Sequence, residues 1–89
     1  MTDDPNVERF RAELAAQDRT VLDAVNARLR LVAELKRYKA DTGLAFVDPE
    51  QERRLLDRLA AENDGPLSEE GVRRLFSELL ALTKRELES

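Results

Sequence analysis

The feature that most constrains this chain is a long stretch without glycine or proline, which runs from Val7 to the residue before Gly43. Apolar residues recur along it at steps of three and four, which is typical of one face of an α-helix. They are Val7, Phe10, Leu14, Val21, Leu22, Val25, Leu29, Val32 and Leu35. Asp3 or Asp4 can cap this helix, Pro5 suits its first turn, and Gly43 provides a stop. We therefore predict one helix of about 36 residues, roughly 54 Å long.

Two shorter helices are predicted to follow the long one. Asp48 is placed to cap the first of them, Pro49 suits its first position, and the Asn63–Pro66 turn ends it. Ser68 is placed to cap the last helix, whose apolar stripe leads to Leu82. The predicted fold class is all-α, with three helices per chain (one long, two shorter), in a single domain of residues 1–89.

Composition narrows the function. Charged residues are 38% of the chain and aromatic residues 4%, which suits charged-surfaced helices rather than a β-sandwich or barrel. A net charge of −4 argues against a nucleic-acid partner. No apolar run approaches the ~20 residues of a membrane span, and no secretory signal pattern follows Met1, so we expect no membrane partner and a cytoplasmic location. Without cysteine and histidine, we expect no zinc site, thiolate nucleophile or Ser-His unit.

The length of the first helix predicts assembly. Its apolar stripe would extend beyond the two shorter helices that could cover it within the same chain. Large exposed apolar patches usually mark a partner surface. A homodimer with paired helices is the simplest closed solution.

Four charged residues interrupt the apolar stripe of the first helix, namely Arg11, Asp18, Arg28 and Lys39. A charge that faces a helix interface costs several kcal/mol unless it is paired or bound. Three cations and one anion leave an excess of positive charge that an anionic ligand would satisfy, and the planar fork of arginine suits carboxylates. Asp18 is interpreted as an internal partner for a cation. The simpler interpretation is that these cations are solvated or snorkelling side chains.

The spacing of the three cations favours a site built from two chains. Arg28 and Lys39 lie three helical turns apart, about 16 Å along the axis, so their long side chains can lean towards each other. Arg11 lies about 25 Å from Arg28, which is too far for one small-molecule site within a chain. In an antiparallel dimer, however, Arg11 of one chain could reach the Arg28–Lys39 region of the other.

These residues also form an ordered set that resembles the AroQ class of chorismate mutase, from about Val7 to Leu87. The set is Arg11, Asp18, Arg28, Lys39, the run Asp48-Pro49-Glu50-Gln51-Glu52-Arg53, and Arg74-Leu75-Phe76 leading to Thr83. The resemblance implies an intertwined homodimer with two equivalent sites. It also implies an intramolecular Claisen rearrangement of chorismate to prephenate, for phenylalanine and tyrosine biosynthesis, that uses no metal or cofactor.

The resemblance assigns a role to each matching position. Arg11 from the other subunit and Arg28 would hold the two carboxylates of the substrate, and Lys39 would contact the ether oxygen and a carboxylate. The pair Asp48 and Glu52 would contact the ring hydroxyl. In place of a family serine that bonds a carboxylate, the chain has Thr83.

Two positions depart from the family pattern. Gln51 stands where the family usually has arginine, and Leu87 where it usually has a glutamine or glutamate aimed at the ether oxygen. Glu86 or Glu88 could replace that donor only if the last helical turn shifts. We therefore expect weak intrinsic activity, a related substrate, or help from a partner, since some short members are activated by the enzyme that opens the shikimate pathway.

Simpler interpretations and other functions stay open beside this one. Asp48 with Gln51 can be a capping pair, Glu52 a surface charge, and Thr83 a residue bonded back to its own helix. Relatives of the same fold act on 4-amino-4-deoxychorismate or eliminate pyruvate from isochorismate. A non-catalytic helical dimer that binds or regulates a partner protein is the third alternative.

Overall fold

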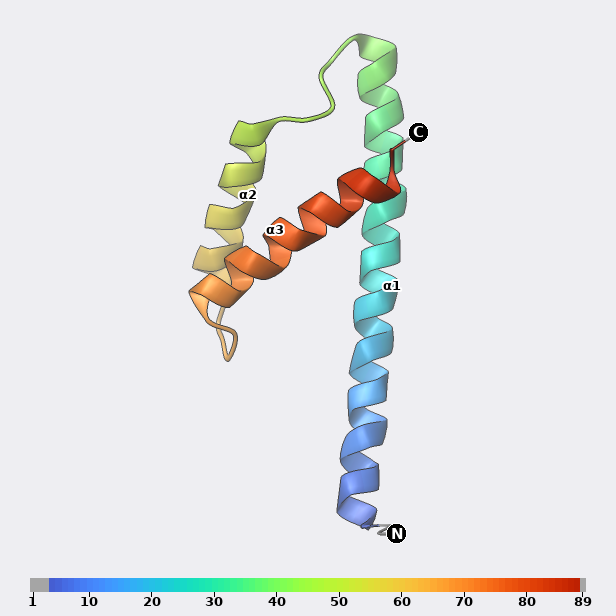
Figure 1. Cartoon of the computed structure of the whole chain (residues 1–89), viewed down its shortest axis with the longest axis vertical. Coiled ribbons are helices and arrows are strands. Elements are labelled where there is room, and N and C mark those ends of the chain that lie inside the picture. Colours follow the sequence, from blue (N-terminus) through green and yellow to red (C-terminus); the bar gives the residue numbers. More distant parts are fainter. Residues whose placement is uncertain (1–3, 89) are drawn as a thin grey trace. The chain divides into compact units, whose positions relative to one another are not determined.

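The computed structural model describes residues 4–88. Within this range the chain forms three α-helices and no strand: α1 (Pro5–Thr42), α2 (Pro49–Glu62) and α3 (Glu69–Glu86) (Figure 1). This confirms the predicted all-α class with one long and two shorter helices. The chain divides into two units, of which one ends at Glu34 and the other begins at Leu35, so α1 contributes to both.

Local hydrogen bonds set the two ends of α1, which spans 38 residues. The Asp4 carboxylate accepts a hydrogen bond from the Asn6 backbone N–H at 2.8 Å. Asp3, the other predicted cap, lies outside the described residues. At the C-terminus Gly43 has a φ of 77°, in the left-handed region that favours glycine, and Leu44 N–H donates to the Lys39 carbonyl at 2.8 Å. The predicted stop at Gly43 is confirmed.

The two short helices begin at their predicted caps. The Asp48 carboxylate accepts from the Gln51 N–H at 3.2 Å, and the Ser68 hydroxyl accepts from the Gly71 N–H at 2.9 Å. The Gln51 side chain accepts a hydrogen bond from Arg54 at 3.4 Å, so its partner lies one turn further along α2 and not at the cap. Helix α2 ends before Asn63, at the predicted turn.

Helices α2 and α3 pack against each other in the second unit and lie side by side in Figure 1. Val72 on α3, which is 4% exposed, is the one buried apolar side chain among residues 4–88. At the surface, Arg73 donates to Asp57 at 2.8 Å across the two helices. Hydrogen bonds from this guanidinium to Asp57 and then to Glu69 raise the pKa of Arg73 above its ordinary value.

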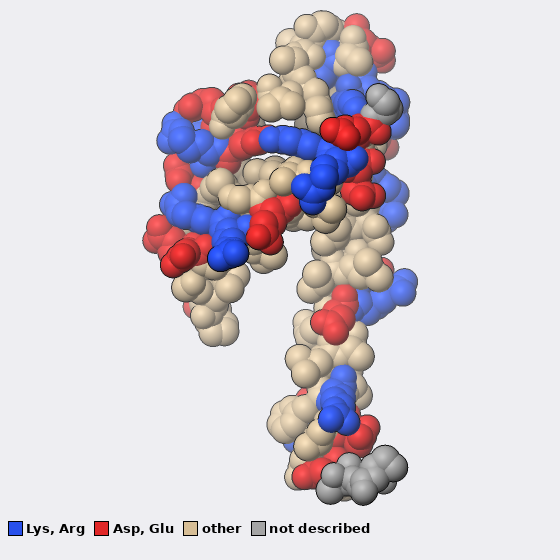
Figure 2. Space-filling view, in the orientation of Figure 1, with Lys and Arg blue, Asp and Glu red and all other residues tan. Residues whose placement is uncertain are grey.

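The apolar stripe in the first unit is exposed up to Leu22, whereas Val25, Leu29 and Val32 are half-buried. Its members Val7, Phe10, Leu14, Val21 and Leu22 are between 41% and 61% exposed. In Figure 2, uncharged surface separates the charged groups along this part of α1, whereas charges of both signs are interspersed over α2 and α3. No helix in the described part of the chain is long and apolar enough to cross a membrane.

Candidate active site

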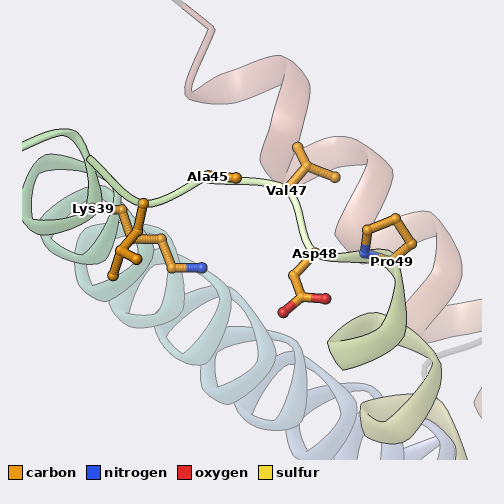
Figure 3. A pocket seen from close by; sticks show the side chains of 6 residues that line it. Lys39, Ala45, Val47, Asp48 and Pro49 are labelled. Carbon is orange, nitrogen blue, oxygen red and sulfur yellow. The ribbon is translucent and has the colours of Figure 1, made fainter. Parts of the chain in front are cut away.

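A pocket of about 450 Å³ opens in the second unit, where the end of α1, the loop after it and the start of α2 meet. It is lined by Lys39, Leu44, Ala45, Val47, Asp48 and Pro49. Figure 3 shows the Lys39 ammonium and the Asp48 carboxylate directed into the same space from opposite sides. The fold thus brings together two predicted site residues, one at the end of α1 and the other at the cap of α2.

The Lys39 side chain is half-buried in the last turn of α1. Its ammonium donates to the Phe46 carbonyl at 3.4 Å, which is long for such a bond, and forms no ion pair with any residue in the range 4–88. An ammonium has three donors, so Lys39 keeps the capacity to bind an anionic or ether oxygen in the pocket.

Asp48 both caps α2 and lines the pocket. One carboxylate oxygen accepts the Gln51 N–H, so the capping interpretation is confirmed. An ionised carboxylate has about four lone-pair sites, and one backbone N–H occupies only one of them. Capping fixes the side chain at the pocket wall and leaves acceptor capacity for a hydroxyl group.

Glu52 lies one turn after Asp48 on α2 and is half-buried. Its carboxylate forms an ion pair with the ammonium of Lys84 on α3, with Nζ at 2.9 Å from Oε2 and 3.1 Å from Oε1.

Thr83, the residue before Lys84, is 4% exposed, and its hydroxyl donates to the Leu79 carbonyl at 2.7 Å. The interpretation of Thr83 as bonded back to its own helix is confirmed, and its oxygen can still accept hydrogen bonds.

None of the three uncertain positions is among the residues that line the pocket. Gln51 and Glu86 are exposed, and Leu87 is the C-cap residue of α3. The Leu87 carbonyl accepts a hydrogen bond from the Lys36 ammonium, which also lies 5.4 Å from the centre of the Phe46 ring. Lys36, near the end of α1, therefore contacts both the end of α3 and the loop between α1 and α2.

The remaining predicted residues, Arg11, Asp18 and Arg28, belong to the first unit. Arg11 is exposed and pairs with Glu8 at 3.4 Å. Asp18 is exposed and forms no ion pair with another residue of the described chain. The joining of Arg11 and Arg28 to Lys39 in one site stays a prediction.

Sequence reasoning missed Lys84 and Lys36, the two lysines that connect α3 to the rest of the second unit. Their partners lie 32 and 51 residues away along the chain. There was a weak indication for Lys84, because it directly follows the predicted site residue Thr83. No local spacing pattern identifies a partner at such a distance, since helix periodicity relates only residues three or four apart.

The fold and the pocket define a class of small all-helical proteins. In it, a lysine at the end of one helix and an aspartate at the start of the next face the same pocket. Residues 10–88 match the family described as chorismate mutase type II, and the chain belongs to this family. The resemblance stated from the sequence is thereby confirmed. Chorismate mutases are isomerases.

Solved structures support the same family. Form I of the chorismate mutase of Thermus thermophilus superposes with a TM-score of 0.85 and 35% identity, over 88% of this chain and 98% of that one. Form II of the same enzyme gives a TM-score of 0.86 and 34% identity, over 90% of this chain and 91% of that one.

Two curated relatives are longer than this chain. The 4-amino-4-deoxychorismate mutase of Streptomyces venezuelae is 38% identical over 60 residues, which are 67% of this chain and 58% of the relative. The bifunctional chorismate mutase/prephenate dehydratase of Pseudomonas aeruginosa is 29% identical over 86 residues, which are 91% of this chain and 24% of the relative. The chain thus spans less than two thirds of either relative.

Proposed function

We propose that this chain is a chorismate mutase, which rearranges chorismate to prephenate for phenylalanine and tyrosine biosynthesis. The observation that carries the proposal is the pocket that Lys39 and Asp48 face, in a chain of the chorismate mutase type II family. The similarity to the Thermus thermophilus enzyme over most of both chains supports it.

The proposed mechanism consists of conformer selection and charge stabilisation. Arg28 and Arg11 of the other subunit bind the two carboxylates through planar bidentate pairs and select the folded conformer whose reacting carbons are close. Lys39 donates to the ether oxygen and stabilises the negative charge that builds as the C–O bond lengthens. This interaction strengthens towards the transition state, so it raises the rate of the chemical step.

The other site residues orient the ring. The carboxylates of Asp48 and Glu52 accept hydrogen bonds from the ring hydroxyl, and Thr83 binds a substrate carboxylate. Asp48 at the pocket wall supports this arrangement, as does the position of Glu52 one turn later on α2. Gln51 supplies no positive charge at its position, so binding of the dianion relies on the other cations.

The proposed site requires an intertwined homodimer, because Arg11 is supplied by the partner chain. The exposed apolar stripe of the first unit supports such an assembly. Pairing two copies of this stripe would remove apolar side chains from water, and each fully buried large side chain contributes about 1.5–3 kcal/mol. A cytoplasmic location and activation by another shikimate-pathway enzyme stay predictions.

A mutase that acts on 4-amino-4-deoxychorismate is the second candidate. The relative of that name from Streptomyces venezuelae, with 38% identity over 60 residues, favours it. The two substrates differ only in a hydroxyl or an amino group at one ring position. Asp48 and Glu52 are the proposed residues that would meet this group.

The proposal is tested by incubating the purified chain with chorismate, following the loss of its ultraviolet absorbance and identifying the product by NMR. Formation of prephenate supports a chorismate mutase. Turnover of 4-amino-4-deoxychorismate alone would support the second candidate, and release of pyruvate from isochorismate would indicate a lyase. No turnover of any of the three would contradict an enzymatic function and leave the non-catalytic helical dimer.

A further inference from the structure

We propose that Lys84 is a specificity-determining residue, which shifts the preference of the site towards a substrate with a neutral 4-hydroxyl and away from one with a positively charged 4-ammonium group. The inference rests on the proposed function and deepens it, because it names the charge that the substrate carries at this position. Its basis is the contact between Lys84 of α3 and Glu52 of α2.

The contact is a close pair in which one ammonium spans both carboxylate oxygens, at 2.9 and 3.1 Å. The side chain of Glu52 is 28% exposed and that of Lys84 is 40% exposed. Partial burial reduces screening by water, so the two charges affect each other and any group bound beside them more than a surface pair would.

The effect of Lys84 on a bound substrate depends on the other charged groups around Glu52. The charged groups near this part of the site are Asp48, which caps α2 one turn before Glu52, and Lys39, which faces Asp48 across the pocket. Gln51, next to Glu52, is neutral. Lys84 therefore offsets one of the two negative charges that the proposed substrate group would meet.

The physical consequence differs for the two substrates. A hydroxyl donates a hydrogen bond to Asp48 or Glu52 without bringing a charge, so Lys84 does not oppose it. An ammonium group would gain from both carboxylates, but it would also lie near the like charge of Lys84. Discrimination between similar ligands commonly depends on such a repulsive element.

The experiment measures kcat/KM for chorismate and for 4-amino-4-deoxychorismate with the unaltered chain and with Lys84→Gln, Lys84→Arg and Arg85→Gln. We expect Lys84→Gln to lower the preference for chorismate, which is the ratio of the two kcat/KM values, by about fivefold relative to the unaltered chain. Lys84→Arg should retain the preference. Arg85→Gln is the matched control, since it removes the neighbouring exposed cation from the same helical turn and should leave the preference unchanged.

A pH series provides a readout that a purely structural role would not change. As the pH rises through the pKa of the substrate amine, the amino substrate becomes neutral and the repulsion disappears. The charge of Lys84 then no longer distinguishes the two substrates, so the difference in preference between the unaltered chain and Lys84→Gln should become smaller as the pH rises. Circular dichroism of each variant verifies that the helices are retained.

The outcomes separate this inference from the function on which it rests. Turnover of neither substrate by the unaltered chain would overturn both. Turnover with an equal preference in the unaltered chain and Lys84→Gln would overturn the role of Lys84 alone. A preference for chorismate that rises in Lys84→Gln would also overturn it.

Discussion

At the residue scale, the ammonium of Lys39 faces a pocket while its bond to the Phe46 carbonyl is long, at 3.4 Å. An ether oxygen that develops negative charge is a stronger acceptor than a backbone carbonyl, so it can draw the ammonium away. The same side chain thus has a weak partner when no substrate is bound and a strong one in the proposed transition state.

We predict that Lys39→Ala abolishes measurable turnover of chorismate, a loss of at least about 10²–10³ in kcat, and leaves helix content unchanged. Arg28→Ala should have the same effect. Steady-state kinetics and circular dichroism provide the two readouts. Arg37→Ala is the control, because Arg37 is an exposed cation of the same helix and should be dispensable. Loss of helix content together with activity would assign Lys39 and Arg28 a structural role instead.

A substitution at Leu87 provides a second test at this scale. Its backbone carbonyl binds Lys36, so substitution of the side chain leaves this contact in place. We predict that Leu87→Gln raises kcat for chorismate by up to about 10², because an amide donor would be restored near the ether oxygen.

The control for Leu87→Gln is Glu88→Gln, which places the same amide one residue later, at an exposed position. It should give no gain. If Leu87→Gln also gives none, the matching of the last turn of α3 to the family pattern is wrong.

At the scale of the helix, Asp48 both begins α2 and lines the pocket. We predict that Asp48→Ala lowers the free energy of unfolding by about 1 kcal/mol, while Asp48→Asn preserves it, because asparagine caps as well as aspartate. Both variants should lose activity, since neither has the carboxylate that is proposed to accept the ring hydroxyl.

Urea unfolding at one fixed chain concentration measures the stability of these variants, because dimer stability depends on concentration. Full activity in Asp48→Asn would show that only the cap matters. Equal destabilisation by both substitutions would instead show that capping is not what the carboxylate contributes.

At the scale of the whole molecule, the exposed stripe of the first unit is the surface on which the proposed assembly would depend. Val21 is 61% exposed in the single chain, so an aspartate there costs little by itself but would be buried without a partner in the dimer. We predict that Val21→Asp converts the protein to monomers and abolishes activity, as measured by analytical ultracentrifugation and kinetics.

Asn26→Asp is the matched control for Val21→Asp. It adds the same negative charge to an exposed position that lies about 140° further round the helix. It should remain dimeric and active. In the unaltered protein, activity per chain should fall on dilution, whereas activity that is independent of dilution in a proven monomer would exclude a site shared between subunits.

The sequence predicted more of the fold than of the candidate site. Helix class, order and ends were predicted closely, because each depends on residues a few positions apart, such as Asp48 with Gln51 and Ser68 with Gly71. Within the site, Lys39 and Asp48 were predicted, and the structure brings them to one pocket. Lys84 was not, because its partner is 32 residues away.

By itself, the sequence determined where the helices begin and end, which face of the first helix is apolar, and which charges interrupt that face. These properties follow from local hydrogen bonding and from the fixed rise and turn of an α-helix. Only the tertiary structure decided that Glu52 meets Lys84 and that the end of α3 is held by Lys36. The reason is that such contacts depend on the path of two turns and on the packing of α2 against α3, which no spacing within one helix encodes.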